Sequence, residues 1–337
     1  MMKAAIFHGP GKALQIERIP IPIPGENEVL IKVCRCGICG SDLQMTSGTG
    51  FTFPAGVALG HEYAGEVVAL GKGVRQLRLG DRITAMPAKG CGHCSACLSG
   101  RSLACAGMQM MMGGFGEYTL VDARVAVRLP DNLSLDDGAL VEPLACSLRG
   151  VSMAGLQRGA RVLVLGAGSI GLGAVYWARR LGAGSVACAA RSAWRGSLAL
   201  EHGADHFLTA DEQLQGRLLD VFGNLADVVF ECSGAPGMLA KAIELVRPGG
   251  SVIGLGLCSG HDHFVPALAA AKDLTLRFTT GYVLDDFHHV IDTLSRGSTE
   301  PRLMIGDTIA LHALPDVLES MRTEQQHCKV MVDPGRA

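Results

Sequence analysis

Four cysteines between positions 91 and 105 have the spacing of a metal-binding group. Cys91, Cys94, Cys97 and Cys105 follow the pattern C-x2-C-x2-C-x7-C, with glycine and serine residues between them. Four thiolates can close a tetrahedron around Zn²⁺, and the small residues let the backbone fold around the ion. An iron–sulfur cluster also uses four cysteines, and this spacing does not exclude one. We expect a closed, structural zinc site.

A second set of possible metal ligands is dispersed along the chain. Cys39 follows an apolar run, His61 and Glu62 are adjacent, and Glu142 precedes a proline. A thiolate, an imidazole and a carboxylate are the mixed set that a catalytic zinc prefers, with one position left open. Residue types alone give this group little weight, because a single histidine is more often a core residue and such a glutamate often begins a helix.

The segment Gly166-Ala167-Gly168-Ser169-Ile170-Gly171 has the pattern of a dinucleotide-binding turn. It lies between an apolar run at 161–165 and a helical pattern at 172–181. An isolated G-x-G-x-x-G is weak evidence, but between a strand and a helix its bare backbone and the helix N-terminus can meet a pyrophosphate. The residues that we place at the cofactor are Gly166, Gly168, Ser169, Ile170 and Gly171.

The next predicted strand, 186–190, indicates which nucleotide is bound. An acidic residue about 20 positions after the glycine turn usually binds the ribose hydroxyls. Here the strand ends in Ala190, and Arg191, Ser192 and Arg195 follow. Without a carboxylate a 2′-phosphate is not repelled, and two guanidinium groups can donate to it. The sequence favours NADP over NAD; the alternative is that both arginines only cover a solvated face.

The elements that must position these residues fall into two groups. The first ~130 residues contain short β-type runs separated by turn residues, whereas strand and helix patterns alternate after Arg158. We therefore predict an α/β protein with a mainly β domain and a doubly wound parallel sheet of the Rossmann type. The β domain is placed at 1–147 and 281–337, and the dinucleotide-binding domain at 148–280.

The composition excludes several classes of function. Thirty Lys and Arg stand against 32 Asp and Glu, so there is no basic excess for nucleic acid or an anionic membrane. The longest uncharged run, 162–178, contains four glycines and is shorter than the ~20 residues of a membrane helix. The first residues do not have the pattern of a signal peptide, and we expect a cytoplasmic protein with reduced cysteines.

Several segments resemble zinc-containing medium-chain alcohol dehydrogenases. The similar segments are GHEYAGEVVALGKGVRQLRLGD at 60–81, GICGSD at 37–42, GGFGEY at 113–118, the cysteine group at 91–105 and the glycine turn at 166–171. Glu142-Pro143-Leu144 looks like the sorbitol, threonine and butanediol dehydrogenase branch. The resemblance implies a GroES-like catalytic domain, two zinc ions per chain, a Rossmann domain and a homodimer or homotetramer.

The resemblance also implies roles for residues near the second metal site. Cys39 and His61 would bind the catalytic zinc, with either Glu142 or Glu62 as a further ligand, and we favour Glu142. Ser41 has the position of the hydroxyl that takes the alcohol proton. Three residues on, where many members carry a histidine that passes the proton to solvent, this chain has Gln44, whose amide cannot titrate near neutral pH.

Further cofactor contacts are implied in the same way. Ser233 would contact the cofactor after the strand that ends in Glu231, and Leu255 and Leu257 would lie near the nicotinamide. Lys329 would reach the cofactor phosphates.

The predicted activity is hydride transfer between NADP(H) and a secondary alcohol or ketone. A group of methionines at 108–112 favours a fairly apolar substrate, unless these residues only pack an interface. Two alternatives stay open: an NAD-dependent polyol or amino-alcohol dehydrogenase, and a ligand-binding or structural protein recruited from the same fold.

Overall fold

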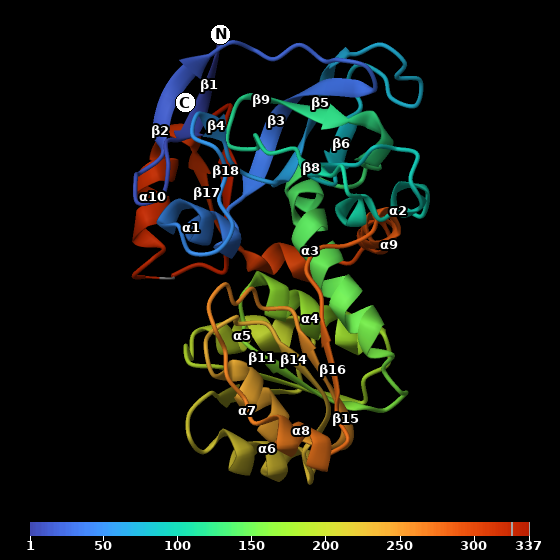
Figure 1. The fold of residues 1–337 in the computed structure, drawn as a ribbon, viewed down its shortest axis with the longest axis vertical. Coiled ribbons are helices and arrows are strands. Elements are labelled where there is room, and N and C mark those ends of the chain that lie inside the picture. The colour runs from blue at the N-terminus through green and yellow to red at the C-terminus, as the bar shows by residue number, and fades with distance from the viewer. Residues whose placement is uncertain (325, 337) are drawn as a thin grey trace. The chain divides into compact units, whose positions relative to one another are not determined.

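A computed structural model describes residues 1–324 and 326–336, and the chain divides into two compact units. The first unit contains Met1–Ala145 and the chain from Tyr282 onward, and the second contains Cys146–Gly281. The first boundary falls inside helix α3 (Leu135–Ala154). Figure 1 shows the course of the chain through both units.

The first unit is built on short, mostly antiparallel strands. In spatial order, its main sheet contains β10 (Ala126–Arg128), β6 (Arg82–Ala85), β5 (Glu62–Leu70), β3 (Glu28–Gly37), β18 (Lys329–Asp333) and β17 (Ile305–Ala310), and β9 (Tyr118–Asp122) also pairs with β3. A second sheet contains β2 (Gln15–Ile19), β1 (Met2–Phe7) and β4 (Val57–Ala58), and β7 (Ala88–Lys89) pairs with β8 (Gln109–Met110). The apolar faces enclose one core that includes Phe7, Ile31, Tyr63 and Phe115.

Short helices complete the first unit. The α-helices besides α3 are α1 (Gly40–Ser47), α2 (Ser95–Leu98), α9 (Leu284–Ser295) and α10 (Leu314–Ser320). The 3₁₀ helices are Ser102–Ala104, Ala123–Val125, Glu300–Met304 and Leu311–Ala313. Helix α1 begins after Cys39, whose backbone N–H donates to the Asp42 carboxylate at 2.9 Å, and it ends at Gly48 with a φ of +81°. These caps fix the segment that carries two predicted site residues, Cys39 and Ser41.

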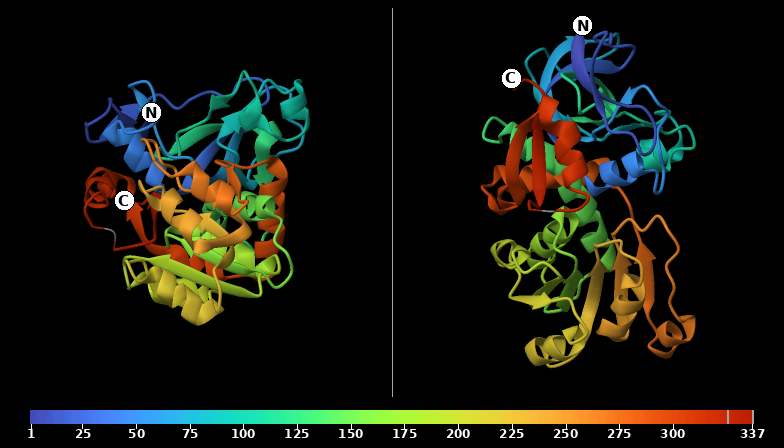
Figure 2. Two further views of the ribbon diagram at one scale, coloured as in Figure 1. Left: turned by 60° about the horizontal axis from the view of Figure 1, so that its bottom comes forward. Right: turned by 90° about the vertical axis from the view of Figure 1, so that its left-hand side faces the viewer.

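The second unit is a six-stranded parallel sheet with helices on both faces (Figures 1 and 2). In spatial order, the strands are β13 (His206–Thr209), β12 (Ser185–Ala190), β11 (Arg161–Leu165), β14 (Ala226–Glu231), β15 (Val246–Gly254) and β16 (Thr275–Phe278). The helices are α4 (Ser169–Arg180), α5 (Arg195–Glu201), α6 (Leu214–Phe222), α7 (Met238–Leu245) and α8 (Pro266–Ala271). This strand order is that of a Rossmann fold, and it confirms the predicted fold class.

Both faces of the parallel sheet are buried. Leu163 and Leu165 of β11 pack in a core with residues of α6, α7 and α8, while Trp177 of α4 is also buried. A strand covered on both faces reads as a continuous apolar run, which is the pattern of 161–165. The sheet therefore holds the glycine turn on a rigid base.

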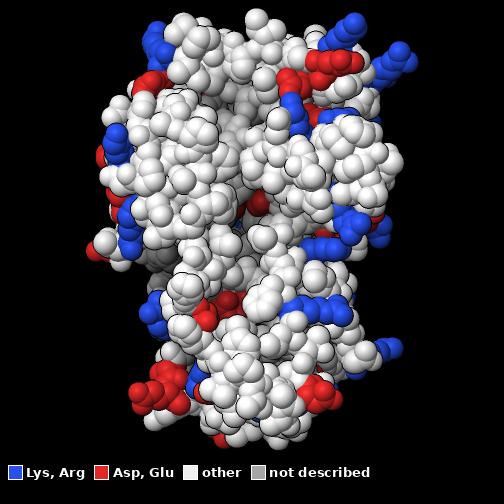
Figure 3. Space-filling view, viewed as in Figure 1, with Lys and Arg blue, Asp and Glu red and all other residues white. Residues whose placement is uncertain are grey.

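The surface agrees with the nearly balanced charge. On the face drawn in Figure 3, basic and acidic side chains are interspersed among uncharged residues. Among the described residues, every helix is too short or too polar to cross a membrane.

Candidate metal centres and cofactor site

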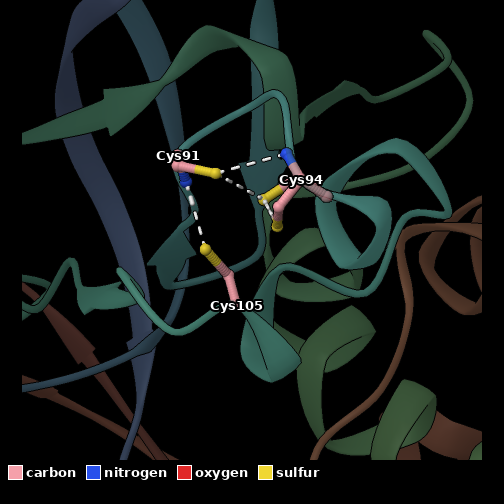
Figure 4. A group of neighbouring side chains, drawn as sticks. Cys91, Cys94 and Cys105 are labelled. Carbon is pink, nitrogen blue, oxygen red and sulfur yellow. Dashed lines mark hydrogen bonds between the residues drawn. The ribbon is translucent and has the colours of Figure 1, made fainter.

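The four cysteines of the lobe at 91–105 converge in the structure. Figure 4 shows three of them, Cys91, Cys94 and Cys105, with their sulfurs directed toward one another. The Sγ of Cys97 lies 3.9 Å from that of Cys91 and 3.6 Å from that of Cys94, and all four sulfurs lie within 4.8 Å of one another. A tetrahedron with metal–sulfur bonds of ~2.3 Å has edges of about 3.8 Å. The donor set and its spacing therefore fit a single zinc ion with no open position.

Backbone N–H groups stabilise two of these sulfurs, those of Cys91 and Cys105, as thiolates. At Cys97 the effect of a backbone N–H is outweighed by burial and by the neighbouring cysteines, which raise the pKa of that thiol to about 11. The N–H of Cys94 donates to Cys91 Sγ, and the N–H groups of Cys91 and Gly107 donate to Cys105 Sγ, at 3.3–3.4 Å. The N–H groups of His93 and Cys94 lower the pKa of Cys91 to about 6, and those of Cys91 and Gly107 lower the pKa of Cys105. A loop that favours the thiolate form at two of its four cysteines is partly prepared for a cation.

Three of the four predicted candidate ligands of the catalytic metal also come together. Donor atoms of Cys39, His61 and Glu62 all lie within 4.8 Å of one another. Cys39 stands directly before α1, and Glu62 is the first residue of β5. The Ser41 hydroxyl lies 3.5 Å from Nε2 of His61. The group fits a zinc ion bound by sulfur, nitrogen and oxygen.

Asp42 orients two of these residues. It is fully buried; its Oδ2 accepts the backbone N–H of Cys39 at 2.9 Å, and its Oδ1 lies 3.6 Å from Nδ1 of His61. Burial lowers the pKa of His61, but the negative charges of Asp42 and Cys39 outweigh it and raise that pKa well above its usual value. A carboxylate behind a histidine ligand is a common way to fix the imidazole. Sequence reasoning missed this role, although the spacing from Cys39 to Asp42 is that of a helix cap.

Glu62 forms a buried ion pair with Lys329. The Lys329 Nζ lies 2.7 and 2.6 Å from the two carboxylate oxygens and 3.0 Å from the carbonyl oxygen of Ile38, and both side chains are 1 % exposed. Burial lowers the pKa of Lys329, but Glu62 more than compensates and raises it. The contact with cofactor phosphates that we expected for Lys329 would require its ammonium to leave this pair.

The sheet register explains how two residues 267 positions apart meet. Strand β3 lies between β5 and β18, and Gly37 of β3 is opposite both Glu62 and Met331. A Cβ atom on Gly37 would overlap the Glu62 carboxylate and lie 3.2 Å from Cδ of Lys329. The missing side chain at this position leaves the space in which the ion pair forms.

Glu142, the ligand that we favoured, is near this group but is not among the donors that lie within 4.8 Å of one another. It is 6 % exposed, in α3. Burial and the charge of Glu62 raise the pKa of Glu142 to about 7, against the opposing effects of His61, Lys329 and a hydrogen bond from the Tyr282 hydroxyl. Tyr282, which the sequence analysis did not single out, is thus a partner of this carboxylate.

In the second unit, the glycine turn joins β11 to α4. Gly166 has a φ of +102°, and a Cβ atom on Gly171 would overlap the carbonyl oxygen of Gly166. A Cβ atom on Gly168 would have nothing within 4 Å. Ser169 and Ile170 begin α4. The first and last glycines are therefore required by the chain itself, while Gly168 leaves its backbone open to a ligand.

The two arginines after β12 have different environments. Ala190 ends the strand, and Arg191 and Ser192 are exposed. Arg195 is only 7 % exposed, and its Nη1 donates to the carbonyl oxygen of Ala167 at 2.8 Å. Arg191 thus presents its charge to solvent beside the turn, and Arg195 turns toward the protein.

The remaining predicted cofactor residues lie after β14 and β15. Glu231, the last residue of β14, accepts the N–H of Ser233 at 2.8 Å and its hydroxyl at 2.6 Å. The N–H of Leu255 donates to the carbonyl oxygen of Glu231 at 2.7 Å, and Leu257 is 36 % exposed. These residues and the glycine turn follow adjacent parallel strands, at the sheet edge where Rossmann folds bind nucleotides.

Known proteins with similar sequences and structures agree with this fold and with the presence of metal and nucleotide sites. Residues 25–131 match the alcohol dehydrogenase GroES-like domain, and residues 169–296 match the zinc-binding dehydrogenase family. The chain is 32% identical to sorbitol dehydrogenase of Bacillus subtilis, over 99% of this chain and 98% of that protein. It is also 32% identical to (R,R)-butanediol dehydrogenase of the same organism, over 99% and 100%.

A solved structure shares the fold over nearly its whole length. It is described as a zinc-binding dehydrogenase from Sinorhizobium meliloti 1021 bound to NADP, with a TM-score of 0.90, 34% identity and 99% of each chain covered. The chain therefore belongs to the zinc-containing medium-chain alcohol dehydrogenases. Within that family it is a zinc-dependent, NAD(P)-dependent alcohol dehydrogenase of the sorbitol and butanediol dehydrogenase-like branch.

Proposed function

We propose that this enzyme transfers hydride between NADP(H) and a secondary alcohol or ketone. The observation that carries the cofactor preference is the end of β12, where Ala190 stands at the position of a ribose-binding carboxylate and the exposed Arg191 follows. A guanidinium can donate to a 2′-phosphate, and no carboxylate at this position repels it. The structure from Sinorhizobium meliloti, which contains NADP, supports the same preference.

The catalytic metal would be held by Cys39, His61 and one carboxylate. Zinc in this position supplies a Lewis acid that polarises a carbonyl oxygen or stabilises an alkoxide. Glu62 lies nearer to the other two donors, but Lys329 already neutralises it, whereas Glu142 is held by Tyr282. We keep Glu142 as the proposed ligand and Glu62 as the alternative.

Ser41 is proposed to hold the proton that the alcohol releases. Its hydroxyl lies beside His61 and can both accept and donate a hydrogen bond. Gln44, one helical turn further along α1, cannot take the proton onward because its amide does not titrate. In this proposal the proton leaves Ser41 through water or through another group. The nicotinamide cofactor supplies or takes the hydride when it is bound.

The substrate class has two candidates. Met108, Met110 and Met111 are partly buried, and such adaptable side chains favour an apolar secondary alcohol or ketone. Met112 instead packs against the main core of the first unit and is not offered as a pocket residue. The names of the similar sorbitol and butanediol dehydrogenases favour a polyol as the second candidate.

The test is a kinetic comparison of both cofactors over secondary alcohols, polyols and bulky ketones. We expect a larger kcat/KM with NADP⁺ than with NAD⁺ at equal concentration. Replacing Arg191 by Ala should raise the KM for NADP⁺ by about tenfold, because one charge-assisted hydrogen bond is lost. Arg180→Ala, on the exposed end of α4, is the matched control. A larger kcat/KM with NAD⁺, or an unchanged KM in Arg191→Ala, would contradict the NADP preference.

A further inference from the structure

The side chain of Arg195 is built into the nucleotide-binding unit. The turn from Arg191 to Trp194 is closed by backbone hydrogen bonds from Arg195 to Ser192 and from Gly196 to Ala193, at 3.2 and 2.9 Å. The Arg195 guanidinium carbon lies 4.5 Å from the centre of the Trp194 ring. This stacking and its burial hold the guanidinium in one place, with Nη1 on the carbonyl oxygen of Ala167.

The carbonyl that Arg195 binds belongs to the glycine turn itself. In a trans peptide the C=O group and the following N–H point in opposite directions, and the chain has no cis peptide among its described residues. Fixing the Ala167 carbonyl toward Arg195 therefore directs the Gly168 N–H away from it. At Gly168 an added Cβ would meet nothing within 4 Å, so this is the open part of the turn.

We propose that Arg195 is a positioning residue, which aims the Gly168 N–H at the cofactor pyrophosphate by holding the Ala167 carbonyl. The exposed Arg191 is then the side chain proposed to meet the 2′-phosphate that distinguishes NADP from NAD. This division of roles rests on the proposed NADP(H) function, but the part played by Arg195 does not, because NAD carries the same pyrophosphate.

Calorimetric titration of the zinc-loaded enzyme separates the two roles. The ligands are NADP⁺, NAD⁺ and adenosine 2′-phosphate, which has no pyrophosphate. In Arg195→Gln we expect the affinities for NADP⁺ and NAD⁺ to fall by the same factor. That factor should be about tenfold, which corresponds to the loss of one charged hydrogen bond. Adenosine 2′-phosphate should bind with unchanged affinity. In Arg191→Gln, NADP⁺ and adenosine 2′-phosphate should weaken while NAD⁺ does not.

A conservative variant covers the case in which Arg195→Gln does not fold. Arg195→Lys keeps one charged donor but loses the flat contact with Trp194, so we expect about threefold weaker binding of both dinucleotides. Arg180→Gln removes a guanidinium that stacks on Tyr176 of α4, away from the turn, and should leave all three affinities unchanged.

Two results would overturn the proposal. If the Arg195 variants weaken NADP⁺ and adenosine 2′-phosphate but not NAD⁺, Arg195 binds the 2′-phosphate itself. If they leave both dinucleotides unchanged, the Ala167 contact has no role in binding. A different pair of results would refute the NADP(H) function: the wild type prefers NAD⁺, and Arg191→Gln leaves the affinity for NADP⁺ unchanged. In that case, equal weakening of NADP⁺ and NAD⁺ binding in Arg195→Gln would still support the positioning role.

Discussion

The two metal-binding regions of the first unit are built in opposite ways. The cysteine lobe takes four sulfurs from 15 consecutive positions, and N–H groups of the same loop stabilise them. The mixed site takes Cys39 and His61 from different segments, and its charged groups include Asp42 and the distant Lys329. The lobe can be completed by local folding, whereas the mixed site exists only after the sheet register is set.

The two kinds of ligand set indicate different functions for the two metals. A closed set of four thiolates leaves no position for substrate, so its metal stabilises the fold. The mixed site has three protein donors within reach of one another, which leaves a coordination position for substrate, and the Ser41 hydroxyl lies beside it. Its metal can therefore take part in chemistry. Damage to one site should therefore change stability, and damage to the other should change rate.

Replacing Cys39 by Ala should have the largest effect on rate. Loss of the Lewis acid, worth several kcal/mol, should lower kcat/KM by at least about 10³-fold. The melting temperature should change little, because the core of the sheet is untouched. Steady-state kinetics and thermal unfolding measure both quantities, with Cys34→Ala, a cysteine outside both metal groups, as the control. Activity within tenfold of wild type would show that Cys39 is not a catalytic ligand.

Replacing Cys97 by Ser should have the opposite pattern. Because metal binding at a structural site contributes directly to folding, loss of one thiolate should lower the melting temperature and the zinc content. The kcat of the folded fraction should fall far less than in Cys39→Ala. If the rate collapses while the melting temperature is unchanged, the assignment of the lobe as structural is wrong.

Replacing Lys329 by Met tests the distant charge of the mixed site. It leaves the Glu62 carboxylate buried without its ion pair, which should reduce the free energy of unfolding by about 3–5 kcal/mol. The double variant Lys329→Met/Glu62→Gln should recover part of that loss, because the buried charge is removed as well. Urea unfolding at pH 7 measures both. If Lys329→Met is as stable as the double variant or more stable, the ion pair does not stabilise the fold.

Replacing Tyr282 by Phe should have the smallest effect. The ring stays packed edge-on against Phe287 of α9, with ring centres 4.9 Å apart, so only the hydroxyl that donates to Glu142 is lost. One hydrogen bond of about 0.5–1.5 kcal/mol predicts a two- to tenfold fall in kcat/KM, with an unchanged melting temperature. Tyr118→Phe on β9 is the control. An unchanged kcat/KM would remove Tyr282 from the site.

Local patterns in the sequence predicted much of the fold. The strand, glycine turn and helix around Gly166 are adjacent in the chain, and so are the four cysteines of the lobe, so both could be read from spacing alone. The parallel sheet followed from the alternation of strand and helix patterns, and the comparisons confirm the family.

Contacts between distant segments could not be predicted. Lys329 meets Glu62 only because β18 and β5 flank β3, with a glycine between them. The expectation that Arg195 faces the 2′-phosphate together with Arg191 stays a prediction, but spacing gave no sign that its Nη1 donates to the Ala167 carbonyl oxygen or that its guanidinium lies over the Trp194 ring. The direction in which a side chain such as Lys329 or Arg195 points depends on tertiary packing, and the spacing of residues in the sequence does not reveal it.

The most direct test of two metal sites with separate roles is the zinc content of the purified enzyme and two variants, measured with activity on the same samples. Wild type should contain two zinc ions per chain, and Cys39→Ala and Cys97→Ser should each contain one. Only Cys39→Ala should lose nearly all activity while it keeps the wild-type melting temperature. One zinc per chain in the wild type, or equal loss of activity in both variants without a loss of stability in Cys97→Ser, would contradict the account.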